Sequence, residues 1–259
     1  ATIGYPPGDL LERDDVVDRN LVQLERIAAL SDEELAIVVG YVERNPLRSG
    51  RALHNAAALC VGGRVADRYL KCLLPTYDVF DEARYFEPGV EARLLEVHGV
   101  RIGVSVCEDV WADPDRDGFS LYHRDPVAEL VDRGAQLLVN ISASPFELGK
   151  AELRRDLVRR YAISSGRFFL YANQVGGNDE LVFDGHSLVF DGQGRVVARA
   201  YAFAEDLLFY DIPAEALAET TGLAGPIGDV REVADDIDGQ ALAALELGVK
   251  RIVVGECGH

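Results

Sequence analysis

The sequence predicts a mixed α/β fold, in which strands paired by short hairpins alternate with helices. Apolar residues recur at helical spacing in residues 14–30, whereas residues 100–106, which form a β-branched run, and residues 136–141 each indicate a strand. Short glycine-containing turns separate other pairs of apolar runs, as hairpins require. With 259 residues, 48% of them hydrophobic, the chain is long enough to bury a sizeable core.

The expected elements follow one another along the whole chain. The first helix, at residues 14–30, has its apolar side chains at Val17, Leu21, Leu24 and Ala28. The elements expected after it are a strand at 35–42, a hairpin of 56–61 with 64–69 around Gly62-Gly63, a strand at 100–106, a helix at 125–133, a strand at 136–141, a helix at 150–165, a strand at 167–173, a hairpin over 181–200 that turns at 191–194, a helix at 240–247 and a strand at 250–254.

Charge and cysteine content exclude several classes of function. The formal net charge of −18 argues against nucleic acid and anionic membranes as partners. No apolar run approaches the roughly 20 residues of a membrane-spanning helix. No signal peptide precedes Ala1, so a cytoplasmic location is expected. The four cysteines contain no CxxC pair, which predicts reduced thiols rather than a metal site or a disulfide framework.

Cys107 ends a strand in the stretch GVSVCEDVW, residues 103–111. Enzymes with α/β folds tend to place chemistry at the carboxyl ends of strands, but an isolated cysteine is also a common core residue. Glu108 and Asp109 favour the first interpretation, because two carboxylates are hard to bury beside a core thiol and indicate a polar cleft. Cys107 is therefore a candidate nucleophile, and the core interpretation stays open at this point.

A nucleophilic thiol needs a base or a cation nearby, because the thiolate is the attacking species. The histidines are poor candidates for that partner, since they lie in turn-like or strand-edge contexts without a companion motif: His54, His98, His123 and His186. Lys71 is a better candidate, because it ends a strand pattern in a chain with only three lysines among 26 cationic residues. A compact ammonium can stabilise a thiolate and a developing oxyanion. The alternative is a solvated lysine at a strand end.

The segment after Lys71 mixes aromatic and carboxylate side chains. It follows a Leu-Leu-Pro break and contains Tyr77, Phe80, Asp81, Glu82, Tyr85 and Phe86. This composition is typical of a loop that lines a polar small-molecule pocket, although the same aromatic residues could simply cap the core.

Five blocks occur in a fixed order along the chain: GYPPGDLL (4–11), LKCLLPTYDVFDEARYFEPG (70–89), GVSVCEDVW (103–111), NISASPFELGK (140–150) and NQVGGNDELVFDGHSLVFD (173–191). Together they resemble the carbon–nitrogen hydrolase (nitrilase) superfamily, and specifically the glutaminase domain of glutamine-dependent NAD synthetases. The resemblance implies an α-β-β-α sandwich of mixed β-sheets flanked by helices over residues 1–212. It implies a linker or the start of a second unit at residues 213–259.

The resemblance also implies glutamine amide hydrolysis through a cysteine thioester, supplying ammonia for NAD synthesis from deamido-NAD. Cys107 would be the nucleophile, and Lys71 with the backbone N–H of Glu108 would stabilise the tetrahedral intermediate. Glutamine would be framed by Tyr5, Tyr77, Phe80, Glu82, Ser144 and Lys150. Within this set Glu82 would hold the α-amino group, and Ser144 and Lys150 would lie near the α-carboxylate. A lysine that opens a helix could equally be solvated.

Two departures from the family pattern affect the expected activity. The family's third catalytic residue, a glutamate base, would lie two residues before Ala1, at the end of a strand that the sequence does not contain. Little ammonia release is expected without that base, and the sheet is expected to have an unprotected edge. No SGGxDS pyrophosphate loop occurs, so ATP and Mg²⁺ are expected to act only in a synthetase domain outside this sequence. Cys257 and His259 are too few ligands for a metal site, and none is expected.

Two other functions remain open from the sequence. A related amidase would act on another amide, and a catalytically inactive scaffold would keep the fold for assembly. The glutaminase domain itself is expected to need no cofactor. Its expected partners are glutamine, the synthetase domain and further copies of the chain in a homo-oligomer.

Overall fold

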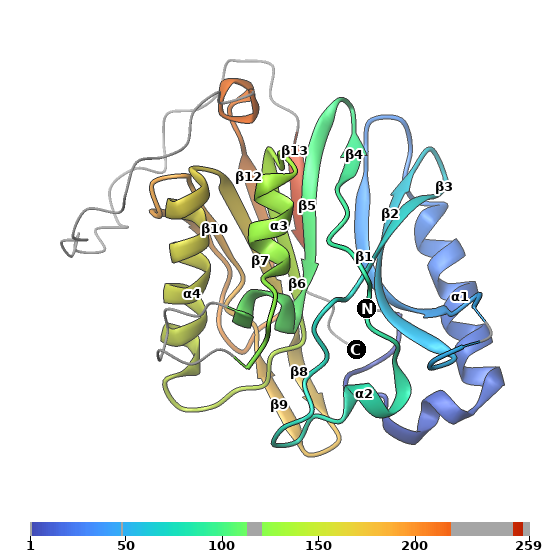
Figure 1. Ribbon diagram of the computed structural model, residues 1–259. Helices are drawn as coiled ribbons and strands as arrows, with labels where there is room; N and C mark the ends of the chain where they lie inside the picture. The colour runs from blue at the N-terminus through green and yellow to red at the C-terminus, as the bar shows by residue number, and fades with distance from the viewer. Residues whose placement is uncertain (1, 48, 113–120, 219–250, 256–259) are drawn as a thin grey trace.

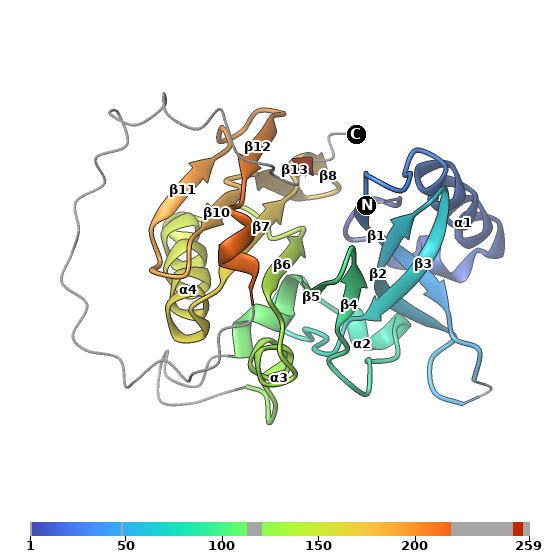
Figure 2. The same ribbon diagram turned by 90° about the horizontal axis from the view of Figure 1, so that it is seen from above.

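The computed structural model describes residues 2–47, 49–112, 121–218 and 251–255. Two β-sheets lie at the centre of these residues, and helices pack on the outer faces (Figure 1). Figure 2 shows the layer order from one side to the other: α1, a three-stranded sheet, a six-stranded sheet, and then α3 with α4. The predicted α-β-β-α arrangement is confirmed. The helix expected at 240–247 and the residues 257–259 considered as metal ligands lie outside the described residues.

The three-stranded sheet is an antiparallel meander covered by one helix. The short helix η1 (Gly8–Glu12) precedes that helix, and the elements are α1 (Asp14–Ala28), β1 (Ile37–Arg44), β2 (Leu53–Val61) and β3 (Arg64–Leu70). The hairpin between β2 and β3 is confirmed, and both residues of its Gly62-Gly63 turn have positive φ. Side chains of β2 alternate as the pleat requires. Ala58 and Cys60 face α1, whereas Ala57 and Leu59 join the core shared with the second sheet.

The second sheet is mixed, as the sequence predicted, with the strand order β11-β10-β7-β6-β5-β4. Its three central strands β5, β6 and β7 are parallel, and the outer strands pair antiparallel. The strands are β4 (Leu95–Val97), β5 (Val100–Val106), β6 (Leu137–Ser142), β7 (Phe168–Asn173), β10 (Leu188–Phe190) and β11 (Val196–Arg199).

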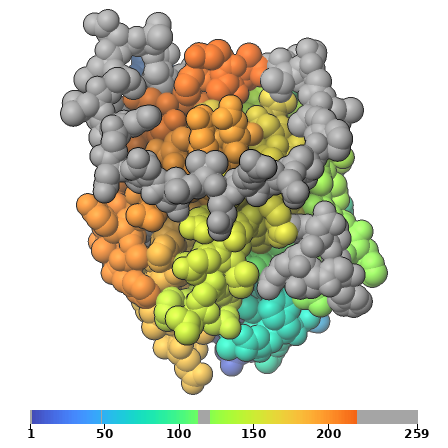
Figure 3. All heavy atoms as spheres, turned by 90° about the vertical axis from the view of Figure 1, so that its left-hand side faces the viewer, coloured from blue at the N-terminus to red at the C-terminus, as the bar shows by residue number. Residues whose placement is uncertain are grey.

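Helical crossovers connect the parallel strands on one face of this sheet. Helix α3 (Pro126–Asp132) joins β5 to β6, and α4 (Lys150–Ser165) joins β6 to β7. In Figure 3 the yellow-green residues of α4 lie at the surface in the middle of the face that looks toward the viewer. Parallel strands bring their carboxyl ends to one edge of a sheet. The segments that follow β5, β6 and β7 therefore meet, and this meeting point positions the site.

The predicted hairpin over residues 181–200 is wrong in part, because the chain forms two separate hairpins there. Strand β8 (Val175–Asn178) pairs with β9 (Leu181–Asp184), and β10 pairs with β11. Gly185 and His186 both have positive φ, which interrupts the extended backbone between β9 and β10. The turn predicted at 191–194 is confirmed, with Gly194 at φ +73 and the Asp191 carboxylate accepting from the backbone N–H of Gln193 and Arg195.

Strand β1 lies at the edge of its sheet, as expected. Part of that edge is covered within the described residues, since Thr2 N–H donates to the Gly40 carbonyl at 3.0 Å. The Asn20 side chain bonds both the N–H and the carbonyl of Val42, at 3.1 and 2.8 Å.

The strand expected at 250–254 is present as β13 (Arg251–Gly255). It pairs antiparallel with β12 (Leu207–Asp211), and the short helix η3 (Ala214–Leu217) follows β12. No helix in the described ranges is long and apolar enough to cross a membrane.

Candidate active site

A cavity lined by residues of both sheets opens where the sheets approach each other at the carboxyl ends of β5, β6 and β7. The second sheet contributes the segments that end these strands, including Cys107, Ala143 and Gln174. The first sheet contributes residues of β1 together with Asn55 of β2. The remaining lining residues come from the amino-terminal segment and from the region after β3, and include Tyr5, Lys71 and Glu82.

Cys107 is the first residue of the short helix η2 (Cys107–Ala112), directly after β5. Its φ of 42° lies in the left-handed region, where a residue other than glycine is strained, and such strain is typical of functional sites. The residue is half-buried and its thiol is free. Burial raises the pKa of the Cys107 thiol, the Lys71 ammonium lowers it, and the carboxylates of Glu108 and Glu82 raise it further.

Lys71 follows β3 and is 1% exposed, so it is buried and not solvated. Its Nζ lies 2.7 and 2.8 Å from the two carboxylate oxygens of Glu82. Burial alone lowers the pKa of Lys71, but the negative charges of Glu82 and of a Cys107 thiolate outweigh it and leave that pKa raised. The side chain is therefore an ammonium beside the thiol at neutral pH.

Glu82 begins the short helix α2 (Glu82–Tyr85) and is engaged by three residues. Besides the Lys71 ion pair, it accepts hydrogen bonds from Tyr5 Oη at 2.8 Å and from Asn55 Nδ2 at 3.2 Å. The geometry therefore shows Glu82 as the residue that holds Lys71. The role in binding the α-amino group of a substrate stays a prediction.

Glu108 is a second buried carboxylate next to the thiol. It accepts from Tyr77 Oη at 2.8 Å and from Tyr122 Oη at 2.7 Å. Aromatic rings extend this group, since the ring centroid of Phe80 lies 5.6 Å from that of Tyr77 and 6.2 Å from that of Tyr5. The structure thus brings together the predicted residues Tyr5, Tyr77 and Phe80 from two distant segments.

Ser144 and Lys150 lie in the segment after β6 and are not among the residues that line the cavity. Ser144 is buried, and its backbone N–H and carbonyl are both bonded by the side chain of Asn173, at 2.8 and 3.2 Å. Lys150 opens α4 and its Nζ lies 3.6 Å from Glu147. Their predicted place near a substrate carboxylate stays a prediction.

Sequence reasoning missed Tyr122, Asn55 and Asn173. Tyr122 reaches Glu108 from a loop without a motif, and Asn55 lies in a strand where a polar residue has no distinctive spacing. Asn173 has a signal in the sequence, since it opens the block at 173–191 and is the last residue of the strand predicted at 167–173. Among the described residues, no group of three or more His, Cys, Asp and Glu side chains could hold a metal ion.

The arrangement is suited to nucleophilic attack on a carbonyl carbon. A thiol at a strained strand end faces the cavity beside a buried ammonium, which favours the thiolate and can donate to a developing oxyanion. Two other ionisable groups act on the thiol. Glu82 forms an ion pair with Lys71, and Glu108 accepts hydrogen bonds from two tyrosines. The site is therefore held rigid before any substrate enters.

Comparison with known proteins shows relatives that are longer than this chain. The chain is 39% identical over 238 residues to a glutamine-dependent NAD(+) synthetase of Synechocystis sp., covering 90% of this chain and 43% of that protein. It is 42% identical over 213 residues to the enzyme of that name from Xylella fastidiosa, a match that covers 82% of this chain and 36% of that protein. The chain thus spans less than half the length of these curated relatives.

Solved structures show the same likeness. A glutamine-dependent NAD+ synthetase from Acinetobacter baumannii superposes with a TM-score of 0.71 at 29% identity, over 86% of this chain and 40% of that one. The NitN amidase from a Nesterenkonia species superposes with a TM-score of 0.63 at 26% identity, over 83% of this chain and 77% of the amidase chain. Residues 12–221 match the family model of carbon-nitrogen hydrolases, and the chain belongs to that family.

Proposed function

We propose that this chain hydrolyses the side-chain amide of glutamine through a thioester on Cys107. The observation that carries the proposal is the buried Lys71 ammonium beside the Cys107 thiol in one cavity. The Cys107 sulfur forms a bond to the amide carbon, and Lys71 with the backbone N–H of Glu108 stabilises the oxyanion. The proton of the thiol passes to the amide nitrogen, the C–N bond breaks, and ammonia leaves. Water hydrolyses the thioester to glutamate and restores the thiol.

The substrate side of the proposal uses the residues around this centre. Tyr5, Tyr77 and Phe80 frame the glutamine side chain, and their ring contacts support that role. Glu82 is proposed to bind the α-amino group, and its place among the residues that line the cavity supports this role.

Ser144 and Lys150 are proposed to bind the α-carboxylate of glutamine. The nearby lining residue Ala143 shows that the segment after β6 reaches the cavity, which supports the assignment.

We further propose that the ammonia serves NAD synthesis in a synthetase domain. The relatives named for that activity support this role, and they are more than twice as long as the matched part. ATP and Mg²⁺ would act in that domain, whereas the hydrolysis needs only the protein's own groups and water. Self-association of the chain is also proposed, by resemblance to the family.

A second candidate function is hydrolysis of a different amide. The likeness to the Nesterenkonia amidase favours it, because that likeness covers most of both chains. A panel of glutamine, asparagine and simple aliphatic amides separates the two functions. Glutamine at least tenfold above the others in kcat/KM supports the first proposal, and an aliphatic amide ahead of glutamine supports the second.

Ammonia release from glutamine, run beside Cys107→Ala, tests the proposal. Release that disappears in the variant supports it, and equal release by both proteins contradicts it.

A further inference from the structure

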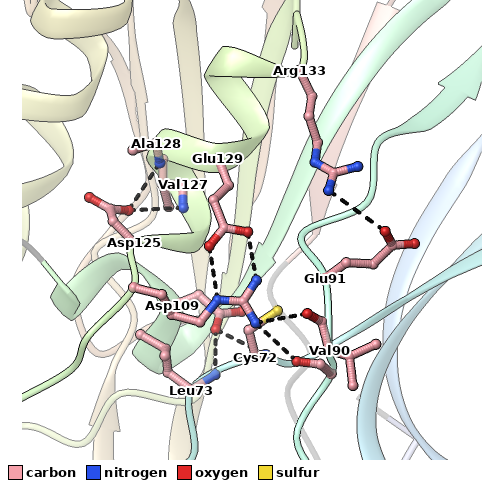
Figure 4. A network of polar contacts seen from close by, with 12 residues as sticks. Cys72, Leu73, Val90, Glu91, Asp109, Asp125, Val127, Ala128, Glu129 and Arg133 are labelled. Carbon is pink, nitrogen blue, oxygen red and sulfur yellow. Dashed lines mark hydrogen bonds and ion pairs between the residues drawn. The ribbon is translucent and has the colours of Figure 1, made fainter.

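The Asp109 carboxylate is fully buried and accepts four hydrogen bonds. Its Oδ1 accepts from the backbone N–H groups of Cys72 at 3.1 Å and Leu73 at 2.9 Å. Its Oδ2 accepts from the Val106 N–H at 3.0 Å and from Tyr69 Oη at 3.0 Å. Figure 4 shows Asp109 beside Cys72 and Leu73 below α3. A buried carboxylate that satisfies so many donors fixes all of them relative to one another.

The donors belong to the two segments that carry the reacting groups. Val106 directly precedes Cys107, whose backbone is strained at φ 42°. Cys72 and Leu73 directly follow Lys71. One segment ends β5 of the six-stranded sheet, and the other ends β3 of the three-stranded sheet. A single carboxylate therefore joins the two sheets at the point where the thiol and the ammonium meet.

Further contacts hold the Lys71 segment from its other side. The Lys71 carbonyl accepts from the Gly89 N–H at 2.7 Å. Arg124 Nη1 donates to the carbonyls of Gly89 and Val90, both at 3.2 Å, and Arg124 Nη2 pairs with Glu129 of α3 at 2.6 Å. The backbone around Lys71 is thus held between Asp109 on one side and the Arg124–Glu129 pair on the other.

We propose that Asp109 is a positioning residue, which sets the distance between Lys71 Nζ and Cys107 Sγ by binding the backbone next to both. Its carboxylate bonds three backbone N–H groups and one tyrosine, so it acts on the thiol and the ammonium through the two segments that carry them. The proposal rests on the proposed function, since it assumes that Cys107 is the nucleophile. It gives Asp109 a role beyond marking a polar cleft.

Asp109→Asn tests the proposal, because asparagine keeps the shape but not the acceptors. One oxygen becomes an NH₂ group, and in either orientation that group would face at least one backbone N–H, which cannot accept. The measurement is the rate of Cys107 alkylation by iodoacetamide, followed by peptide mass from pH 6 to 10 without glutamine. The charged groups that act on this thiol are Lys71, Glu108 and Glu82.

The sign of the effect separates positioning from charge. If Asp109 positions Lys71, the variant loses the ammonium's stabilisation of the thiolate and Cys107 is alkylated at least tenfold more slowly at pH 8. If Asp109 acts only as a negative charge, its loss favours the thiolate and alkylation becomes faster. Slower alkylation in a folded variant supports the proposal, whereas an unchanged or faster rate overturns it.

A matched control and a second variant keep the test decisive. Asp191→Asn makes the same change in another buried carboxylate that accepts from backbone N–H groups, in the β10–β11 turn, and should leave Cys107 alkylation unchanged. If Asp109→Asn does not fold, Tyr69→Phe removes one of the four donors and should slow alkylation about threefold. An unchanged rate in folded Tyr69→Phe then overturns the proposal.

The alkylation assay also separates this proposal from the proposed function. It uses no glutamine, so a protein that releases no ammonia can still show the Asp109 effect. In that case positioning stands and glutamine hydrolysis fails. If ammonia release depends on Cys107 but alkylation is unaffected by Asp109→Asn, glutamine hydrolysis stands and positioning fails.

Discussion

At the scale of single residues, the most informative side chain is the buried lysine at position 71. Burying an ammonium and a carboxylate costs several kcal/mol per ion unless both are paired and hydrogen-bonded. Lys71 and Glu82 meet that condition, with Tyr5 and Asn55 completing the contacts of the carboxylate. A buried ion pair is weak evidence for stability. Its position beside Cys107 in one cavity is the reason why we propose a catalytic role for Lys71.

Lys71→Gln is expected to slow alkylation of Cys107. Burial, Glu108 and Glu82 raise the pKa of the thiol, and Lys71 lowers it. Removing Lys71 therefore raises that pKa further and reduces the thiolate fraction at pH 8. A rise of one pKa unit corresponds to about a tenfold slower reaction. The rate should climb with pH through pH 9 in the native protein, because its thiol pKa is already above the ordinary value.

The control for this measurement is Arg93→Gln, which removes a cation from an exposed ion pair with Asp67. Its alkylation rate should match that of the native protein. A Lys71→Gln variant that reacts as fast as native protein would show that the ammonium does not act on the thiol.

The residues of the site could be predicted only where a local pattern marked them. Cys107 and Lys71 end recognisable strands, and both line the cavity. Tyr122 and Asn55 have no local signal, because their role comes from contacts with Glu108 and Glu82 that only the folded chain creates. The sequence marks Asp109 as a carboxylate close to a cysteine, but three of its four donors come from the distant stretch at residues 69–73 and only Val106 is a near neighbour.

At the scale of elements, helix α3 lies so close to β5 that one glycine becomes critical. A Cβ added at Gly103 would lie 2.9 Å from Leu138 Cδ2 and 3.1 Å from the Cβ atoms of Ala135 and Leu130. The glycine thus lets α3 and β6 pack tightly against the strand that delivers Cys107. This contact links the packing of an element to the geometry of the site.

Gly103→Ala is expected to destabilise the fold by about 1–3 kcal/mol, the usual cost of overpacking a filled core. Urea unfolding followed by circular dichroism measures the change. Gly177→Ala is the matched control, because a Cβ there meets only the Leu181 carbonyl at an ordinary 3.7 Å. Equal stability of the two variants would contradict the tight packing of α3 and β6 on β5.

Most elements could be predicted because their signals are local. Helix α4 was expected at 150–165 and occupies those residues, since it begins and ends at glycines in the left-handed conformation. The predicted single hairpin joined β9 and β10, two short apolar runs that the polar residues 184–187 separate. Positive φ at Gly185 and His186 ends the first hairpin there, so that β9 pairs with β8 and β10 pairs with β11.

At the scale of the whole molecule, two sheets of different size meet at one cavity. The proposed catalytic pair is divided between them, with Lys71 after β3 and Cys107 after β5. The sequence could not predict this meeting from pattern alone, because sheet packing depends on contacts between distant segments. The resemblance to carbon-nitrogen hydrolases predicted two sheets packed between helices, and the layered arrangement of the structure confirms this fold.

The central claim is that Cys107 is a nucleophile poised for glutamine. Its most direct test is covalent labelling by a diazoketone analogue of glutamine, with the labelled peptide identified by mass spectrometry. We predict one label on Cys107, slowed by added glutamine but not by an aliphatic amide, and lost in Cys107→Ala. Labelling at another cysteine, or labelling of Cys107 that glutamine does not slow, would contradict the claim.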